Sequence, residues 1–81
     1  DLLPGLLMTC RHENIKYGWN PLHKDELYDL EIDPYEMENR IDNPAYADSL
    51  ANMRRRMLQF MERTDHKSIG RFRAGTPVSE I

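Results

Sequence analysis

The chain has 81 residues with 11 basic and 14 acidic side chains, a net charge of −3 and a single cysteine. This charge balance gives no field that would draw the chain to nucleic acid or anionic lipid, and no apolar run approaches the roughly 20 residues of a membrane span, so we expect neither partner. Cys10 cannot form an internal disulfide, and no Cys and His residues have zinc-site spacing, so one small domain with a modest core is expected.

Short apolar runs in the first half of the chain predict a small, mostly antiparallel sheet. We expect its strands at about residues 6–10, 15–19 and 26–30. A polar connection, residues 11–14, separates the first two runs and is typical of a β-hairpin. Pro21 cannot donate to a ladder, which predicts a loop before the third run.

The faces of this sheet follow from the alternation of side chains along each strand. On the second strand, the expected core face consists of Ile15, Tyr17 and Trp19. On the third, Leu27 shares one face with Asp29, and Tyr28 shares the other with Leu30. Apolar side chains would thus lie on both faces, whereas one helix can cover only one of them. We expect the uncovered face to dock against a further domain.

A first helix signal follows the third strand. Asp33 precedes Pro34 and stands three residues before Glu36, which together resemble an N-cap, a proline at the first helical position and a capping box. This pattern predicts a short helix at about residues 34–39. Ile41 stands alone among polar neighbours, and we expect it to pack back into the core.

A second signal, Asn43 before Pro44, predicts a long amphipathic helix at about residues 44–63. Its apolar positions step by three and four: Tyr46, Leu50, Met53, Met57, Phe60 and Met61. The tail, residues 67–81, contains glycine and proline without a period and is expected to be extended or disordered. The expected fold class is α+β, a small antiparallel sheet packed against one long C-terminal amphipathic helix within residues 1–66.

No pattern of residues predicts a catalytic or metal site. We interpret Cys10 as a half-buried strand cysteine, because its spacing from His12 does not guarantee contact with an activating base. Asp29, Glu31 and Asp33 alternate like the first ligands of an EF-hand loop, but proline follows where that loop needs glycine. These carboxylates are better interpreted as a solvated rim and a helix cap.

Two other patterns favour structure over binding. Arginines occupy residues 54–56 of the long helix, and three consecutive helical residues turn through about 300°, so they cannot all point one way. Without interleaved aromatics, nucleic-acid binding is weakly supported. The aromatic residues Tyr17, Trp19, Tyr28 and Phe60 could stack on a ligand, but their spacing is that of a core.

The residues between the second strand and the long helix recur in a known order. They are Lys16-Tyr17, Glu26-Leu27-Tyr28-Asp29-Leu30, Asp33-Pro34, Glu36, Asn39, Asp42, Pro44 and Tyr46-Ala47. This order resembles the C-terminal subdomain of the sulfatases, which typically shows K-Y, then E-L-Y-D-L-x-x-D-P-x-E-x-x-N-L, then D-P-x-Y and a last helix. The match spans roughly residues 6–64. Arg40 departs from it, standing where the family has an apolar residue.

The resemblance implies a parent enzyme that hydrolyses sulfate esters or sulfamates. Such enzymes use a formylglycine made from Cys or Ser in C/S-x-P/A-x-R and a calcium ion held by Asp and Asn side chains. In this chain His12 and Asn14 follow Cys10 where that motif needs Pro or Ala and then Arg. We therefore expect no catalytic or metal residue here, and both calcium and formylglycine in a missing N-terminal catalytic domain that is this chain's partner.

By this interpretation the chain is a piece of a longer protein with a structural and pocket-rimming role. His23 and Lys24, in the loop entering the third strand, are the candidates for reaching a sulfated substrate, with Lys24 as a cation for the anionic group. A periplasmic, secreted or lysosomal location would fit the family. The alternative is an independent interaction module that binds a partner protein through the same sheet and helix.

Overall fold

The sheet has three antiparallel strands in the order β1-β2-β3. The computed structural model describes residues 8–75 of the chain. The strands are β1 (Met8–His12), β2 (Ile15–Trp19) and β3 (Glu26–Asp29). They pair antiparallel, with Tyr17 of β2 flanked by Cys10 on one side and Leu27 on the other.

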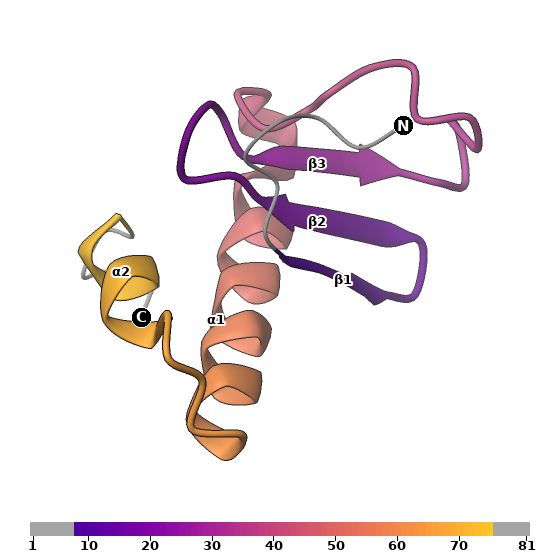
Figure 1. Cartoon of the computed structure of the whole chain (residues 1–81). Coiled ribbons are helices and arrows are strands. Elements are labelled where there is room, and N and C mark those ends of the chain that lie inside the picture. Colours follow the sequence, from indigo (N-terminus) through magenta and orange to yellow (C-terminus); the bar gives the residue numbers. More distant parts are fainter. Residues whose placement is uncertain (1–7, 76–81) are drawn as a thin grey trace.

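The helices follow the sheet in the chain and cover one of its faces. A single 3-10 turn, η1 (Pro44–Tyr46), leads directly into α1 (Ala47–Arg63), and a short helix, α2 (Ile69–Ala74), comes after it. Figure 1 shows α1 running across the strands behind the sheet, with α2 beside it. The α+β class is therefore confirmed, but the long helix is not the last element. Within residues 8–75, no helix combines the length and the apolar character that a membrane span requires.

The hairpin is tighter than the sequence predicts. Only Glu13 and Asn14 form the turn, so residues 11 and 12, expected in the connection, extend β1 instead. Glu13 adopts a positive φ of 55°, and the Asn14 carbonyl accepts a hydrogen bond from the Leu30 N–H at 2.7 Å. The longer ladder satisfies more backbone groups than an open connection would. Residues 6 and 7 of the expected first strand lie outside the described residues.

The short helix expected at residues 34–39 does not form. The Asp33 carboxylate accepts hydrogen bonds from the backbone N–H groups of Met37 and Glu38, both at 3.0 Å, and so closes a loop of turns. Glu36 has a positive φ of 56°, which is incompatible with a right-handed helix. The Asp-Pro signal is real as a capping signal, but the capped groups belong to a loop.

Helix α2 lies in the tail that was expected to be extended or disordered. Phe72 is only 1% exposed, and its ring meets that of Trp19 edge to face, with centroids 5.2 Å apart. Burial of a large aromatic side chain outweighs the weak local signal of a segment that contains Gly70. The prediction for residues 67–81 is thus wrong for α2, and the folded unit extends beyond residue 66. Residues 76–81 lie outside the described part.

The core lies between the sheet and the two helices. Its buried apolar residues are Tyr17, Trp19, Leu27, Met53, Met57, Leu58, Met61 and Phe72. Tyr46, Leu50 and Ile41 are partly buried against this cluster. Phe60, expected in the buried stripe, is 42% exposed, because α1 turns its Met57 and Met61 toward the sheet and leaves Phe60 on the flank. Leu58, absent from the expected stripe, is buried in this same cluster.

The face of the sheet opposite α1 is polar. Lys16 on that face pairs with Glu36 at 3.0 Å, and the Tyr28 hydroxyl donates to Glu26 at 2.8 Å. Burial and that hydrogen bond raise the pKa of Tyr28 to about 12. The expected apolar patch is wrong, because Leu30 lies beyond the end of β3 and does not extend the strand's face.

Candidate functional site

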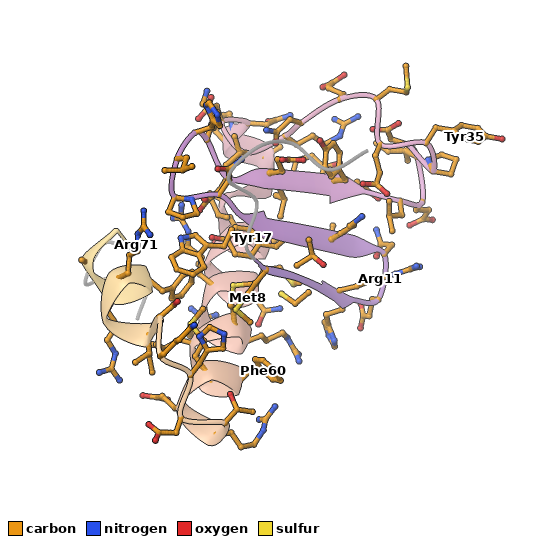
Figure 2. All side chains as sticks on the ribbon, in the orientation of Figure 1. Met8, Arg11, Tyr17, Tyr35, Phe60 and Arg71 are labelled. Atoms are coloured by element: carbon orange, nitrogen blue, oxygen red, sulfur yellow. The ribbon has the colours of Figure 1, made fainter. Side chains whose placement is uncertain are left out.

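A polar cleft opens where the loop between β2 and β3 meets both helices. Its volume is about 370 Å³. The residues lining it are Trp19, Asn20, Pro21, His23, Asp25, Ile41, Arg54, Arg71 and Gly75. Figure 1 shows α2 on the same side of the sheet as this loop, and Figure 2 shows Arg71 extending from α2 there. The cleft therefore combines one loop with side chains from α1 and α2.

The loop is held in place by Asn20. This residue is buried, and its side-chain oxygen accepts hydrogen bonds from the N–H groups of Leu22 at 3.2 Å and His23 at 3.0 Å. Its own N–H donates to the Asp25 carboxylate at 2.9 Å. An asparagine that bonds its neighbouring backbone in this way is a common turn device, so the Asn-Pro sequence fixes the cleft wall locally.

Asp25 joins the sheet to α1 at the floor of the cleft. Its carboxylate accepts a hydrogen bond from the Tyr17 hydroxyl at 2.6 Å, and Arg54 lies 3.6 Å away. Burial first, and the bond to Asp25 second, raise the pKa of Tyr17 well above its ordinary value. Tyr17 therefore stays protonated and donates at all ordinary pH values.

The charges of the cleft favour an anionic group. Arg54 and Arg71 contribute two cationic side chains and Asp25 one anionic side chain, with His23 at the rim. Guanidinium groups bind carboxylate, sulfate-like or phosphate-like oxygens through paired N–H donors. Across residues 8–75, no group of three or more His, Cys, Asp or Glu side chains is arranged to hold a metal ion. Two guanidinium groups in one cleft are an arrangement that can bind an anion.

The two residues expected at a substrate rim have different surroundings. His23 is exposed and lines the cleft. Lys24 does not line it, and its ammonium group pairs with the Asp42 carboxylate at the surface. Arg54, Arg71 and Asp25 were missed by sequence reasoning. The arginine triplet at residues 54–56 was a partial signal for Arg54, because its three side chains cannot all point the same way. No pattern in the neighbouring sequence predicts a role for Arg71.

A second set of contacts closes the outer edge of β3. Asn39 accepts a hydrogen bond from the Leu27 N–H at 2.9 Å and donates to the Asp25 carbonyl at 3.1 Å. The Arg40 N–H then donates to the Leu27 carbonyl at 2.8 Å.

Comparison with protein-family models and with curated proteins found no match to this chain.

Asp29 ties the hairpin to the start of α1. Its carboxylate accepts hydrogen bonds from the Tyr46 hydroxyl and the Asn14 amide, both at 2.8 Å, and these bonds lower the pKa of Asp29. A carboxyl group whose pKa is lowered by folding stabilises the fold above its ordinary pKa of about 4 and loses this effect as the pH falls.

We expect Asp29→Asn to lower the thermal midpoint by a few degrees at neutral pH, because the charge that strengthens both hydrogen bonds is removed. The gap between wild type and variant should shrink as melts are repeated at pH values that fall progressively below about 4, because the stabilisation is lost as the pH falls through the lowered pKa of Asp29 in the folded state. An equal gap at both pH values would show that the charge of Asp29 contributes nothing.

Proposed function

We propose that this chain is the C-terminal subdomain of a formylglycine-dependent sulfatase, with a structural and pocket-rimming role. One observation carries the proposal. Residues of the family-like motif form hydrogen bonds that join the sheet to the loops and helix: Tyr17, Asp29, Asn39 and Tyr46. Because each of these side chains has a partner in another element, the motif is understandable as one structural unit rather than as a chance series of dipeptides.

The partner in this proposal is an N-terminal catalytic domain that holds the calcium ion and the formylglycine. A surface suited to it lies on the side of the sheet opposite α1, next to the loop that Asp33 organises. Tyr35 and Met37 in this loop are 84% and 83% exposed, and the loop is tied to the sheet by the Lys16 to Glu36 ion pair. Exposed large apolar side chains on an ordered loop are typical of an interface.

Glu26 supports the same surface. It is buried on this face, yet its Oε2 atom has no hydrogen-bond partner in the part of the chain that the structure describes. A buried carboxylate oxygen without a donor costs about 1–3 kcal/mol or more. Because Oε2 is buried, the Glu26 side chain would have to move on docking for an N–H or O–H donor of the catalytic domain to reach it and remove that cost.

The rim role is proposed for the loop between β2 and β3. His23 lines the cationic cleft, and Lys24 stands next to it in the same loop. The ion pair of Lys24 with Asp42 is exposed at the surface, and such pairs stabilise proteins by only about 0–1 kcal/mol. Lys24 can therefore exchange Asp42 for the anionic group of a sulfated substrate at little cost.

The isolated chain should release no sulfate from an aryl sulfate in the presence of calcium, because it contains no C/S-x-P/A-x-R sequence. Sulfate release should be measured on the 81-residue chain and on the longer protein proposed here. Turnover by the isolated chain that persists after repurification and disappears on Cys10→Ala would contradict the proposal.

In the longer protein, Lys24→Ala should raise KM for a sulfated substrate by about fivefold with little change in kcat, as the loss of a cation that binds substrate and transition state equally would do. The thermal midpoint should stay the same. Lys67→Ala is the matched control, because Lys67 is an exposed lysine outside the loop between β2 and β3. An unchanged KM for Lys24→Ala would contradict the proposal that Lys24 contacts the substrate at the rim of the pocket.

A second candidate function is an independent interaction module. It is favoured by the packing of the described residues, in which α1 and α2 already bury one face of the sheet against a continuous core. It is also favoured by a groove beside β1 that no described residue fills. The two candidates differ in whether a catalytic domain is covalently joined to this chain.

A further inference from the structure

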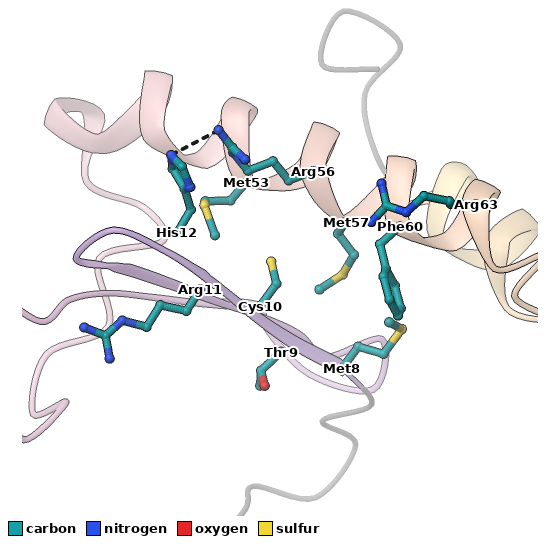
Figure 3. A pocket seen from close by; sticks show the side chains of 10 residues that line it. All are labelled: Met8, Thr9, Cys10, Arg11, His12, Met53, Arg56, Met57, Phe60 and Arg63. Atoms are coloured by element: carbon teal, nitrogen blue, oxygen red, sulfur yellow. Dashed lines mark hydrogen bonds between the residues drawn. The ribbon is translucent and has the colours of Figure 1, made fainter.

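A groove of about 290 Å³ runs between β1 and α1. Its apolar lining comes from Met8, Cys10, Met53, Met57 and Phe60. Figure 3 shows the side chains of Cys10, Met53 and Met57 directed into the space between strand and helix, whereas Thr9 and Arg11 point away from α1. Methionine side chains are flexible and polarisable, which suits them to line a surface that accepts a partner.

The backbone beside this groove is an open sheet edge. Leu27 directs its N–H and C=O outward to residues 39 and 40, so Tyr17, its partner in register, must direct its own backbone groups to Cys10. By the same alternation, Thr9 and Arg11 direct their backbone groups away from β2. No hydrogen bond within residues 8–75 occupies those groups.

The two edges of the sheet therefore differ. The outer edge of β3 is closed by Asn39 and Arg40, while no residue among 8–75 closes the outer edge of β1. An unpaired edge is a template for one more strand. The groove continues from this edge toward α1, so a strand added there would bury alternate side chains against the apolar lining.

The charges around the groove are of one sign. Arg11, Arg56 and Arg63 surround it, and none of them is within ion-pair distance of a carboxylate in the described part of the chain. Arg56 contacts the His12 ring at 3.0 Å, and Arg63 lies over the Phe60 ring at 5.9 Å from its centroid. These arginines are available to an anionic partner.

We infer that a partner protein adds an extended segment to β1 as a fourth strand, and that this segment alternates apolar with acidic side chains. The apolar side chains would enter the groove, and the acidic ones would lie beside Arg11 on the opposite face. Acidic residues at the ends of the segment would meet Arg56 and Arg63. A second copy of this chain is a poorer occupant, because β1 contains no acidic residue and a second β1 would bring no carboxylate to the arginines of the groove.

The test uses the 81-residue chain and a short capped peptide that alternates glutamate with valine. Calorimetric titration should show binding that weakens as salt is added, since the rim arginines contribute electrostatically. A peptide of the same composition with its glutamates and valines in two blocks should bind about tenfold more weakly or not at all, because it cannot present one apolar face. Equal binding of the two peptides would overturn the proposal.

Two pairs of variants separate the backbone contribution from the charge contribution. Thr9→Pro removes an outward N–H from an edge position where proline is tolerated, and should weaken binding about tenfold, whereas Thr9→Val keeps the N–H and should bind like wild type. Arg63→Glu should weaken binding by a similar factor, whereas Arg55→Glu, on an exposed residue outside the groove lining, should change it little. Circular dichroism checks that each variant is folded.

Retained affinity in both Thr9→Pro and Arg63→Glu would rule out an added strand at this edge. A concentration-dependent dimer that Thr9→Pro abolishes, measured by sedimentation without peptide, would identify a second copy as the occupant and would also overturn the proposal. This interface does not depend on the sulfatase assignment, so either proposal can fail without the other.

Discussion

Leu27→Asp should abolish the cooperative thermal transition of the chain. Leu27 is 0% exposed, stands next to Tyr17 in the sheet and belongs to the core under α1. An ionised carboxylate there would have no cationic partner, and a buried unpaired charge costs several kcal/mol. Small domains have total stabilities of only about 5–15 kcal/mol, with the smallest at the low end. The cost of this one buried charge is therefore comparable to the whole free energy of unfolding of the chain.

Leu22→Asp is the matched control for this prediction. Leu22 is 66% exposed in the loop between β2 and β3, so its replacement should change the free energy of unfolding by no more than about 0.5 kcal/mol. Both variants should be followed by far-ultraviolet circular dichroism during heating. A Leu27→Asp variant that melts as sharply as Leu22→Asp, and at a similar temperature, would place Leu27 outside the core.

Phe72→Ala should lower the free energy of unfolding by about 3–5 kcal/mol, the usual cost of removing a buried aromatic ring. The ring is fully buried and meets Trp19 edge to face, so its loss leaves a cavity and releases α2 from the sheet. Trp19 is the single tryptophan of the chain, and its fluorescence therefore reports on this contact during urea unfolding.

The matched control for Phe72→Ala is Phe60→Ala on the exposed flank of α1. This change removes the same side chain from a position that is 42% exposed and should cost about 1 kcal/mol or less. Trypsin should cleave after Arg71 or Arg73 faster in Phe72→Ala than in Phe60→Ala, because α2 is then undocked. Equal urea midpoints for the two variants would mean that α2 does not contribute to the core.

The sheet and the main helix could be predicted from local patterns. Alternation in Ile15 to Trp19 and the helical spacing of Met53 and Met57 each arise from burial on one face, which the sequence carries directly. Helix α2 could not be predicted this way, because its stability comes from the contact between Phe72 and the distant Trp19. The helix predicted after Asp33 was wrong for a related reason. An aspartate side chain accepts hydrogen bonds from backbone N–H groups in the same way whether those groups begin a helix or belong to a loop.

The candidate site was less predictable than the fold. His23 could be found from its loop, because Asn20 and Pro21 mark that loop in the sequence. Arg54 and Arg71 enter the cleft from two helices, and only the packing of α1 and α2 brings them together. The groove beside β1 had no sequence signal either, because an open edge is a property of strand order. Which edge is closed depends on tertiary contacts, such as those of Asn39 at the outer edge of β3.

The nucleotide sequence directly upstream of the codon for Asp1 tests the proposed sulfatase subdomain most directly. If the proposal is right, the reading frame continues upstream and encodes a catalytic domain with the sequence C/S-x-P/A-x-R. A start codon close to Asp1, with no such domain before it, would contradict the proposal and leave the independent interaction module as the function.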